Sequence, residues 1–479
     1  MKMITTKLSM VSRFFTKRIT KRSWLADNCP HLISGQAGMT VDTCLPAKAG
    51  STTYLVELQT SYAMIGKKRR ICLILFLFFS CYFSGFSQSL EDYFRIGAEQ
   101  NPGLISKYKA FEAAMQRVDQ VNSLADPNLT LGYFVSPVET RVGPQRMRFS
   151  LSQAFPWFGT LGAQENVAKL TAEAKYQEFL DARNNLYFQI SAAYFPMVEL
   201  KKTIELEQRN LDVLKKYKEI STIKFENGTG TMVDVLRTEL ILEDAETNLK
   251  LLLEKEIPLR ARFNNLLNEP AMKEVTIQEN LDLNPVPRNY RKDSLTYSNP
   301  RLEALDLQMK ASEANQLAIK KQGLPKLGVG VDYVIIDERT DMVMSDNGKD
   351  VLMPMVTMSI PIFRGKYKAA QKEAGLMKEA FALQKDDLEN QLTGNYERIA
   401  FELRTQAEFL QKYDRQIQLT TQSLELLMRA YSNSGNDYEE VLRMQQELLK
   451  YEKQKIEALI KYQISKAELD YITSYSPSF

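Results

Sequence analysis

From residue 88 to its end, the chain contains neither cysteine nor histidine. For this region the absence excludes disulfides, Cys or His nucleophiles, His general bases and the usual ligands of zinc and copper. Most enzyme classes are therefore excluded, and we expect no catalytic residue, no cofactor and no metal site. The residues in question all come earlier in the chain: Cys29, His31, Cys44, Cys72 and Cys81.

The net charge of +3 averages two unlike regions. Residues 1–87 carry 12 Lys and Arg against 3 Asp and Glu, which leaves a net charge of −6 for the remaining residues. A mildly acidic chain of this kind gives no electrostatic reason to bind nucleic acid. Five methionines lie close together in the sequence: Met342, Met344, Met353, Met355 and Met358. Their thioethers would suit Cu(I). Methionine also fills apolar surface, and because this region has no His or Cys we interpret the five residues as apolar surface.

An export signal is predicted at residues 64–87. Four basic residues (Lys67–Arg70) precede an apolar run (Ile71–Phe79), and small residues at Gly85 and Ser87 suit cleavage. The apolar run is shorter than the roughly 20 residues that a membrane-spanning helix needs. We therefore interpret the segment as a signal peptide.

A signal peptide belongs at the start of a chain, yet residues 1–63 precede this one. That segment shows no periodicity, so we predict that it is an upstream extension and that Met64 is the true initiator. Lipidation of Cys81 is the alternative to cleavage near Ser87. The bulky residues before Cys81 favour cleavage near Ser87.

Four later stretches alternate apolar and polar residues, the pattern of a strand with one apolar face. A short loop with Pro137, Gly143 and Pro144 joins the first two, which are predicted to form a hairpin. The apolar faces consist of Leu129, Leu131, Tyr133 and Val135; Met147, Phe149, Leu151 and Phe155; Leu327, Val329, Val331, Tyr333 and Ile335; and Leu352, Val356, Met358, Ile360 and Ile362.

Each pair of strands is predicted to lead into a very long helix, one ending near Asn227 and one running from about Lys366 to Tyr431. At 1.5 Å per residue, about 64 residues span ~96 Å. Pro196 and, in the next helix, Pro258 should each kink their helix. A heptad seam predicts coiled-coil packing of the first long helix: Leu186, Ile190, Ala193, Met197, Leu200, Ile204, Leu211, Leu214 and Phe225.

The chain repeats itself. Asn299-Pro300 matches Asn101-Pro102, and the turn followed by Val441-Leu442-Arg443 matches the turn followed by Val235-Leu236-Arg237. Both halves are predicted to follow the order helix, strand, strand, long helix, turn, helix, which indicates a duplication. We place the first repeat and its connector at 88–298 and the second repeat at 299–476.

Four strands of about ten residues have the length and alternation of an outer-membrane barrel, but they are too few to close one. An open edge in lipid would leave backbone groups unpaired. The expected fold class is therefore an α+β membrane protein, in which a transmembrane β-barrel is shared by three subunits and continues into long α-helical coiled coils. The alternative is a soluble periplasmic coiled-coil scaffold.

These features resemble the TolC family of outer-membrane efflux proteins over residues 89–474. The most specific motifs are Ser359–Gly365, similar to the family's strand-to-helix motif, and Gly228 followed by Val233–Leu236. Departures are small: Lys366 replaces a glycine, and Glu440 stands where the first turn has Asp234.

The resemblance implies a homotrimer in the outer membrane of a Gram-negative bacterium, extending into the periplasm as a long helical barrel. Such a trimer is the passive exit duct of a tripartite efflux pump or a type I secretion system. Its partners would be a periplasmic adaptor (a membrane fusion protein), an inner-membrane transporter of the resistance-nodulation-division or ABC type, and outer-membrane lipid. A duct for heavy-metal efflux is an alternative within the family.

The resemblance places the functional residues at the two turns, where family members meet the adaptor. The simpler interpretation is that glycine permits the reversal while Asp234 and Glu440 stabilise helix N-termini. The predicted adaptor contacts are Gly228, Thr229, Gly230, Val233, Asp234, Val235, Leu236, Arg237, Gly435, Asn436, Tyr438, Glu440, Val441, Leu442 and Arg443. Residues that would close the periplasmic end are Tyr217, Arg237, Tyr431 and Arg443.

Overall fold

A computed structural model describes residues 89–278, 286, 287, 289–434 and 438–475. The chain divides into two units, Met1–Gly85 and Phe86–Phe479, and every described residue belongs to the second. The predicted upstream extension, the export signal and Cys81 lie outside the described residues, as do Gly435 and Asn436.

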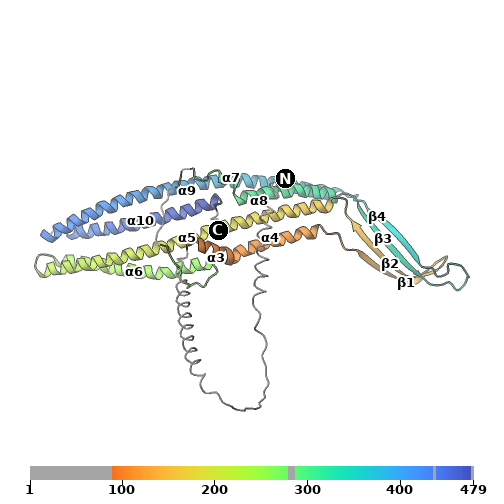
Figure 1. The fold of residues 1–479 in the computed structure, drawn as a ribbon, viewed down its shortest axis with the longest axis horizontal. Coiled ribbons are helices and arrows are strands. Elements are labelled where there is room, and N and C mark those ends of the chain that lie inside the picture. Colours follow the sequence, from red (N-terminus) through yellow and green to blue (C-terminus); the bar gives the residue numbers. More distant parts are fainter. Residues whose placement is uncertain (1–88, 279–285, 288, 435–437, 476–479) are drawn as a thin grey trace, which may run out of the picture. The chain divides into compact units, whose positions relative to one another are not determined.

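Within this part of the chain, two halves share one order of elements (Figure 1). The first half contains α3 (Leu90–Gln100), α4 (Pro102–Val121), β1 (Asn128–Thr140), β2 (Gly143–Phe155), α5 (Thr160–Glu226) and α6 (Met232–Leu266). The second contains α7 (Ser294–Tyr297), α8 (Pro300–Gln322), β3 (Lys326–Ile336), β4 (Val351–Ser359), α9 (Gly365–Ser434) and α10 (Tyr438–Ile472).

The long helices are present and slightly longer than predicted, with 67 residues in α5 and 70 in α9. Helical backbone continues through Pro196 in α5 and through Pro258 in α6. The kinks at both prolines stay predictions. Among the described residues, no helix has both the length and the apolar character required to cross a bilayer.

The two Asn-Pro motifs have the same structural role. The Asn101 side chain caps α4 by accepting from the Leu104 N–H, and it donates to the Leu266 carbonyl at the end of α6 (2.9 Å). Asn299 likewise caps α8 and donates to the Ile472 carbonyl at the end of α10 (3.1 Å). Each asparagine therefore ties the start of one helix to the end of another in its own half, while the proline supplies a first residue that needs no hydrogen-bond acceptor.

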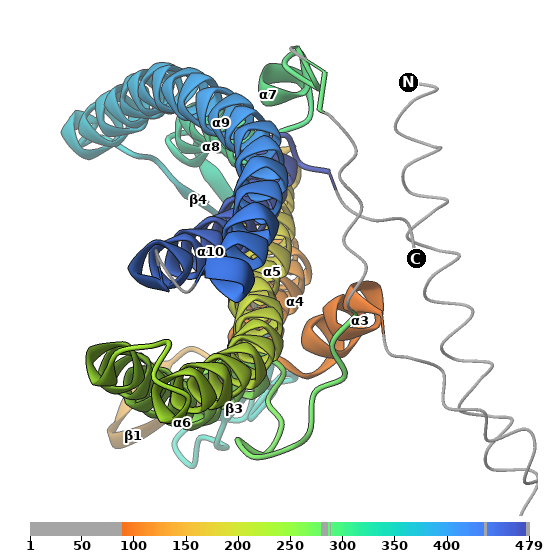
Figure 2. The ribbon, with the colours of Figure 1, turned by 90° about the vertical axis from the view of Figure 1, so that its left-hand side faces the viewer.

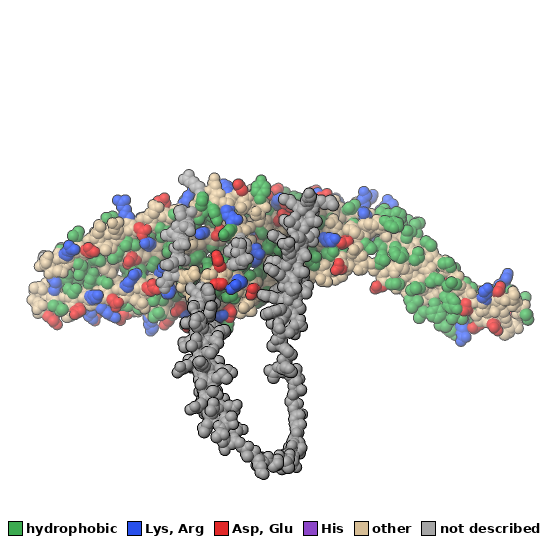
Figure 3. All heavy atoms as spheres, in the orientation of Figure 1, with side chains coloured by type: hydrophobic (Ala, Val, Ile, Leu, Met, Phe, Trp, Pro, Cys, Tyr) green, Lys and Arg blue, Asp and Glu red, His purple; other side chains and the backbone are tan. Residues whose placement is uncertain are grey.

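The four strands form one antiparallel sheet in the order β1-β2-β3-β4. Register aligns the predicted apolar residues across it: Leu131 lies opposite Phe149, Phe149 opposite Tyr333, and Tyr333 opposite Leu352. Many of these large apolar side chains are exposed, including Leu131, Tyr133 and Val356. Figure 3 shows hydrophobic side chains gathered over the strands. One face of the sheet is thus an uncovered apolar surface.

Three details differ from the sequence-based expectation. The predicted loop residues lie in strands: Gly143 and Pro144 begin β2, and Pro137 belongs to β1, where an irregularity in register between Tyr133 and Val138 accommodates it. β4 ends at Ser359, so Ile360 and Ile362 follow the strand, and Pro361 between them has no N–H for a ladder. Phe225 is exposed, whereas most of the predicted seam residues of α5 are buried.

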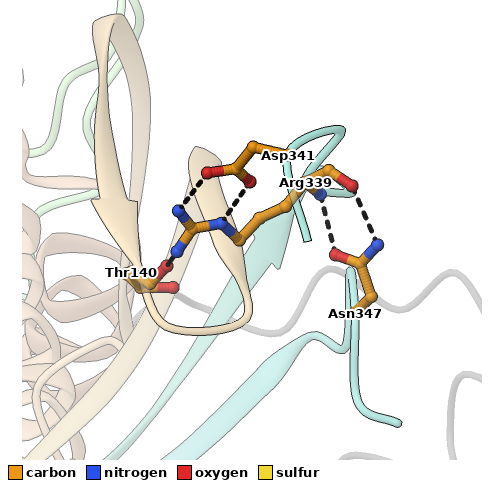
Figure 4. A network of polar contacts seen from close by, with 4 residues as sticks. All are labelled: Thr140, Arg339, Asp341 and Asn347. Atoms are coloured by element: carbon orange, nitrogen blue, oxygen red, sulfur yellow. Dashed lines mark hydrogen bonds and ion pairs between the residues drawn. The ribbon is translucent and has the colours of Figure 1, made fainter. Parts of the chain in front are cut away.

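The two turns at the far end of the strands are bound to each other (Figure 4). Arg339 donates to the Thr140 carbonyl (3.2 Å) and to both carboxylate oxygens of Asp341, while Asn347 exchanges two hydrogen bonds with the Arg339 backbone. The Gly348 N–H donates to the Val142 carbonyl (2.7 Å). These contacts give the loop between β3 and β4 a defined structure.

The helices lie side by side in the order α6, α5, α10 and α9, with α4 against α5 and α8 between α5 and α9. Figure 2 shows them as a curved layer, viewed from the end at which α5 turns into α6 and α9 into α10. The largest apolar cluster lies midway along α5, where Ile190, Tyr194 and Val198 pack against Phe263 of α6 and Ile460 of α10. The cluster holds α5 against α6 and α10, and α5 continues from it to the turn that leads into α6.

Candidate functional site

The first turn, between α5 and α6, is defined by glycine and by backbone hydrogen bonds. Gly228 adopts a left-handed conformation (φ +67°), and the N–H groups of Thr229 and Gly230 both donate to the Lys224 carbonyl, at 2.9 and 3.0 Å. These bonds satisfy the end of α5 and turn the chain within a few residues. A side chain at Gly228 would meet open space, so conformation alone calls for glycine there.

α6 begins with a capping box. The Thr231 hydroxyl accepts from the Asp234 N–H, and the Asp234 carboxylate accepts from the Thr231 N–H, both at 3.3 Å. Two otherwise unpaired backbone donors are satisfied in this way, and a carboxylate lies at the positive end of the helix. The predicted helix-stabilising role of Asp234 is therefore confirmed.

The end of α9 and the start of α10 pack against α5 near the first turn, through a cluster that we call the tyrosine cluster: Tyr217, Tyr431, Tyr438, Val441 and Leu442. The Tyr438 hydroxyl donates to the Tyr217 carbonyl (3.1 Å) and lies 2.7 Å from the Thr238 hydroxyl. The rings of Tyr431 and Tyr438 are 4.7 Å apart. All three tyrosines are buried, so they join the two halves within one chain.

Lys224 is the cation of this cluster. Its ammonium donates to the Tyr431 carbonyl (2.7 Å) and lies 4.4 Å from the centre of the Tyr431 ring. Burial raises the pKa of Tyr431 to about 12 and also raises the pKa of Tyr217 and of Tyr438. The phenols therefore stay neutral at physiological pH. Within the described residues the Tyr431 hydroxyl has no hydrogen-bond partner.

The two predicted arginines lie on the surface of the turn region. Arg237 of α6 donates to Glu439 of α10 (2.6 Å), which links the two halves at their ends. Arg443 pairs with Glu440 one turn earlier on α10, and this pair lowers the pKa of the Glu440 carboxyl. Both arginines are exposed. Exposed ion pairs contribute little to stability, so neither arginine is required for the fold.

Farther from the turns than the tyrosine cluster, α5 and α10 meet along a polar contact that we call the polar seam: Glu207, Asn210, Gln445 and Lys453. Glu207 is almost fully buried and forms an ion pair with Lys453. Gln445 donates to Asn210 (3.1 Å), and both are buried. Burial also raises the pKa of Glu452, the neighbour of Lys453 on α10.

The structure divides the predicted turn residues into two sets. Gly228, Thr229, Val233 and Leu236 are exposed, with Met232 beside them, and form a small apolar surface at the turn. The buried set supports this surface from below: Val235, Tyr438, Val441 and Leu442. Whether the exposed set contacts a partner stays a prediction.

Sequence reasoning missed Lys224, Thr238, Glu439 and the polar seam. Glu207 and Asn210 carried a usable signal, because they interrupt the apolar seam between Ile204 and Leu211. Their partners on α10 lie more than two hundred residues away and have no local signature. Among the described residues there is no group of three or more His, Cys, Asp or Glu side chains that could hold a metal ion.

No family model matches the sequence, and no curated protein matches it. Solved structures do match in fold. The outer membrane protein VceC of Vibrio cholerae is 16% identical with a TM-score of 0.65, over 80% of this chain and 95% of that one. The CmeC outer membrane channel of Campylobacter jejuni is 14% identical with a TM-score of 0.65, over 80% and 85%.

The MtrE outer membrane channel of Neisseria gonorrhoeae, solved in an open state, is 16% identical with a TM-score of 0.62, over 80% of this chain and 88% of that one. At such identities the likeness concerns the fold. The resemblance to the TolC family that the sequence motifs indicate is confirmed at that level, and this chain has the fold of outer-membrane channel subunits.

Proposed function

We propose that this chain is one subunit of an outer-membrane export duct, formed by three copies and opened at the turns when partners dock. The observation that carries the proposal is a sheet with an exposed apolar face and two unpaired edges. In lipid, unpaired strand edges are not tolerated, so β1 of one copy must pair with β4 of the next. Three copies supply twelve strands, a number compatible with a membrane barrel.

The helices support the same head-to-tail arrangement. α9 carries a row of apolar side chains spaced 7, 18, 18 and 7 residues apart, close to whole turns at 3.6 residues per turn. Each is 54–69% exposed in the single chain: Leu376, Leu383, Phe401, Leu419 and Leu426. An apolar row of this length is a surface for another helix.

α6 carries a matching row, Leu236, Leu240 and Leu251, also exposed and spaced by whole turns. α5 and α10 lie between α6 and α9, so the two rows belong to opposite edges of the subunit. β1 and β4 are likewise the two edges of the sheet. A ring in which one edge meets the opposite edge of the next copy buries both rows and leaves no free edge.

The localisation follows from this arrangement. The apolar face of the sheet contacts outer-membrane lipid, and the long helices extend from it through the periplasm. At their ends, the exposed set Gly228, Thr229, Val233 and Leu236 meets a periplasmic adaptor, which links the duct to an inner-membrane transporter of the resistance-nodulation-division or ABC type. The duct itself is passive, and the transporter selects the substrate.

Opening takes place at the polar seam and the tyrosine cluster. Separation of α10 from α5 at the turn end widens the aperture in the manner of an iris. Arg237 and Arg443, exposed at the ends of the helices, line the aperture, while Tyr217 and Tyr431 hold the closed arrangement from inside the chain. The Gln445–Asn210 hydrogen bond at the seam can be exchanged for bonds to water, which keeps the free-energy cost of opening small.

The ring is tested with cysteines at Leu240 and Leu426. Each lies eight residues from the turn end of its helix, so they are at equal height on opposite edges. Residues 88–479 contain no cysteine, so the introduced thiols are the only ones after signal cleavage. In outer-membrane extracts of the variant with both cysteines, a short bis-maleimide should link neighbouring chains. The expected products are single chains, two linked chains, three linked chains, and three chains linked into a closed ring.

Variants with only one of the two cysteines are the controls and should stay single chains. Species larger than three chains would contradict a closed ring, because an open head-to-tail contact continues indefinitely. Recovery of the protein in the soluble periplasmic fraction would support the scaffold alternative instead.

Docking at the turn is tested by Val233→Arg, which places a charge in the exposed apolar surface. It should reduce capture of the adaptor by chemical crosslinking, while trimer recovery stays unchanged. The matched control is Ile105→Arg, which makes the same kind of change at an exposed position of α4. Equal capture by both variants and by the unmodified protein would contradict adaptor contact at this turn.

A further inference from the structure

The polar face of the sheet carries a pair of charged residues that the proposed opening mechanism does not use. Asp332 of β3 is fully buried, although the neighbouring strand β4 is largely exposed. Its carboxylate accepts from the Arg148 guanidinium and from the Ser150 hydroxyl, both on β2. Ser150 lies directly opposite Asp332 in the sheet, and Arg148 lies opposite Val334, the next residue on the same face.

Arg148 covers the carboxylate. Its side chain is 46% exposed while that of Asp332 is 0% exposed. On β1 the residue opposite Arg148 is Gly132, which leaves room beside the guanidinium. Arginine does not give up its proton in proteins, and a buried carboxylate without a partner is strongly disfavoured. The two groups are therefore held as an ion pair with no net charge.

The rest of this face is nearly free of charge. Arg146 pairs with Asp337 (3.5 Å) where β2 meets the far turns, and Lys326 stands at the opposite end of β3. Between these ends, Arg148 and Asp332 are the charged residues of the described strands on this face. The other positions, placed by alternation and register, include Asn128, Thr130, Gly132, Ser150, Ser152, Ala154, Gly328, Gly330, Val334, Val351, Met353, Met355 and Thr357.

We propose that the Arg148–Asp332 pair determines the ion selectivity of the strand-lined part of the channel. The inference rests on the proposed function, since it requires the polar face to line the lumen of the ring. Three copies place three pairs at one level. Asp332 cancels the charge of Arg148, so the half-exposed guanidinium offers hydrogen-bond donors to passing solutes without making this level anion-selective.

The test uses the purified trimer in planar bilayers, with the chloride-to-potassium permeability ratio measured from the reversal potential in a KCl gradient. Asp332→Asn leaves three uncompensated guanidinium groups. The ratio should rise about threefold at 0.1 M salt, and the change should shrink at 1 M salt, where screening is stronger. Arg148→Gln should move the ratio in the opposite direction.

The double variant Arg148→Gln/Asp332→Asn removes both charges and should restore the unmodified ratio, which identifies the two residues as one unit. Because Asp332→Asn alters a buried group, Gly132→Asp provides a test that leaves the pair intact. A Cβ at Gly132 comes no closer than 3.9 Å to Arg148, and the added carboxylate should shift the ratio toward potassium.

Lys273→Gln is the control, because it removes a charge from the connector after α6, away from the strands. It should leave the permeability ratio unchanged. If the unmodified trimer conducts and all the strand variants keep its ratio, the selectivity role of Arg148 and Asp332 is wrong while the proposed function stands. If the unmodified trimer gives no channels, the proposed function fails first.

Discussion

Beyond the tyrosine cluster, the two halves of the chain meet in two chemically different regions. Midway along α5, the contact is apolar, because Ile460 of α10 belongs to the same buried cluster as Ile190 and Tyr194 of α5. Toward the turns, the same helix α5 meets α10 through Glu207–Lys453 and Asn210–Gln445. One pair of helices is thus joined by apolar packing at one level and by polar contacts at another.

Because the two regions differ in chemistry, the free energy needed to separate α10 from α5 differs between them. Separating the apolar region exposes large side chains to water, at roughly 25 cal/mol per Å². Separating the polar seam exchanges the Gln445–Asn210 hydrogen bond for bonds to water, and a typical bond contributes only about 0.5–1.5 kcal/mol net. A buried ion pair is similarly close to balanced against its hydration. The halves should therefore part more readily at the polar seam than midway along α5.

The largest expected effect comes from disrupting the apolar cluster midway along α5. Phe263 is fully buried among Tyr93, Tyr194 and the α10 residue Ile460. Phe263→Ala should lower the free energy of unfolding by about 3–5 kcal/mol, through lost burial and a cavity. Thermal unfolding of the purified protein measures it. Tyr297→Ala, at an exposed position, is the control and should change little; equal losses in both would contradict the assignment of this core.

The second effect breaks the polar seam. Lys453→Ala leaves the Glu207 carboxylate buried without its partner, which should destabilise the closed arrangement by about 2 kcal/mol, since Lys453 is partly exposed. Single-channel conductance should rise because the turns part more readily. The double variant Glu207→Leu/Lys453→Leu removes both charges and should regain most of the stability. No gain over Lys453→Ala would argue against a specific pair.

A third effect concerns Asp470, a partly buried carboxyl near the end of α10. Burial, partly opposed by Lys466 and Arg291, raises the pKa of Asp470 from 3.8 to about 6. The folded state therefore binds this proton more tightly than the unfolded chain, so stability is highest below pH 3.8 and falls as the pH rises through about 6. Asp470→Asn should stabilise the protein by about 2 kcal/mol at pH 7.5 and by much less at pH 4.5.

Thermal unfolding at the two pH values, compared with the unmodified protein, measures this dependence. A gain of equal size at both values would show that Asp470 does not titrate as stated. Because Asp470 lies in the part of α10 beyond the polar seam, the substitution should leave single-channel conductance unchanged.

The smallest effect is a difference between substitutions at two tyrosines of the tyrosine cluster. The Tyr438 hydroxyl bonds to Tyr217 and Thr238, while the Tyr431 hydroxyl has no partner among the described residues. Tyr438→Phe should cost about 1 kcal/mol and raise the open probability. Tyr431→Phe removes an unpaired hydroxyl and should be neutral or slightly stabilising. Equal effects of the two substitutions on open probability would contradict the hydrogen-bond assignment.

The elements were predictable because their signals are local. Alternation at period 2 located the four strands, heptad spacing located α5, and the repeated Asn-Pro motifs marked the same joint in both halves. The ends of elements depended on single residues: Pro137 is accommodated within β1, and Pro361 follows the end of β4. Local pattern alone does not distinguish these two outcomes.

The partners across the fold were not predictable. Asp332 reads as an ordinary polar position of an alternating strand, and only the register of β2 against β3 reveals that Ser150 and Arg148 lie beside it. Lys453 and Gln445 likewise acquire their roles from the rotation of α10 about its own axis. The turn sequence itself did indicate where the chain reverses and where α6 begins, because glycine and the capping box have local signatures.

The most direct test of the account measures distances between spin labels on α5 and α10 at the two levels. Lys215 and Gln446 are exposed toward the turns, and Gln189 and Lys461 are exposed midway. On adding Lys453→Ala, the first pair should show a longer and broader distance distribution while the second stays unchanged. If both pairs lengthen together, or neither changes, the two halves do not separate at the polar seam and the proposed opening is wrong.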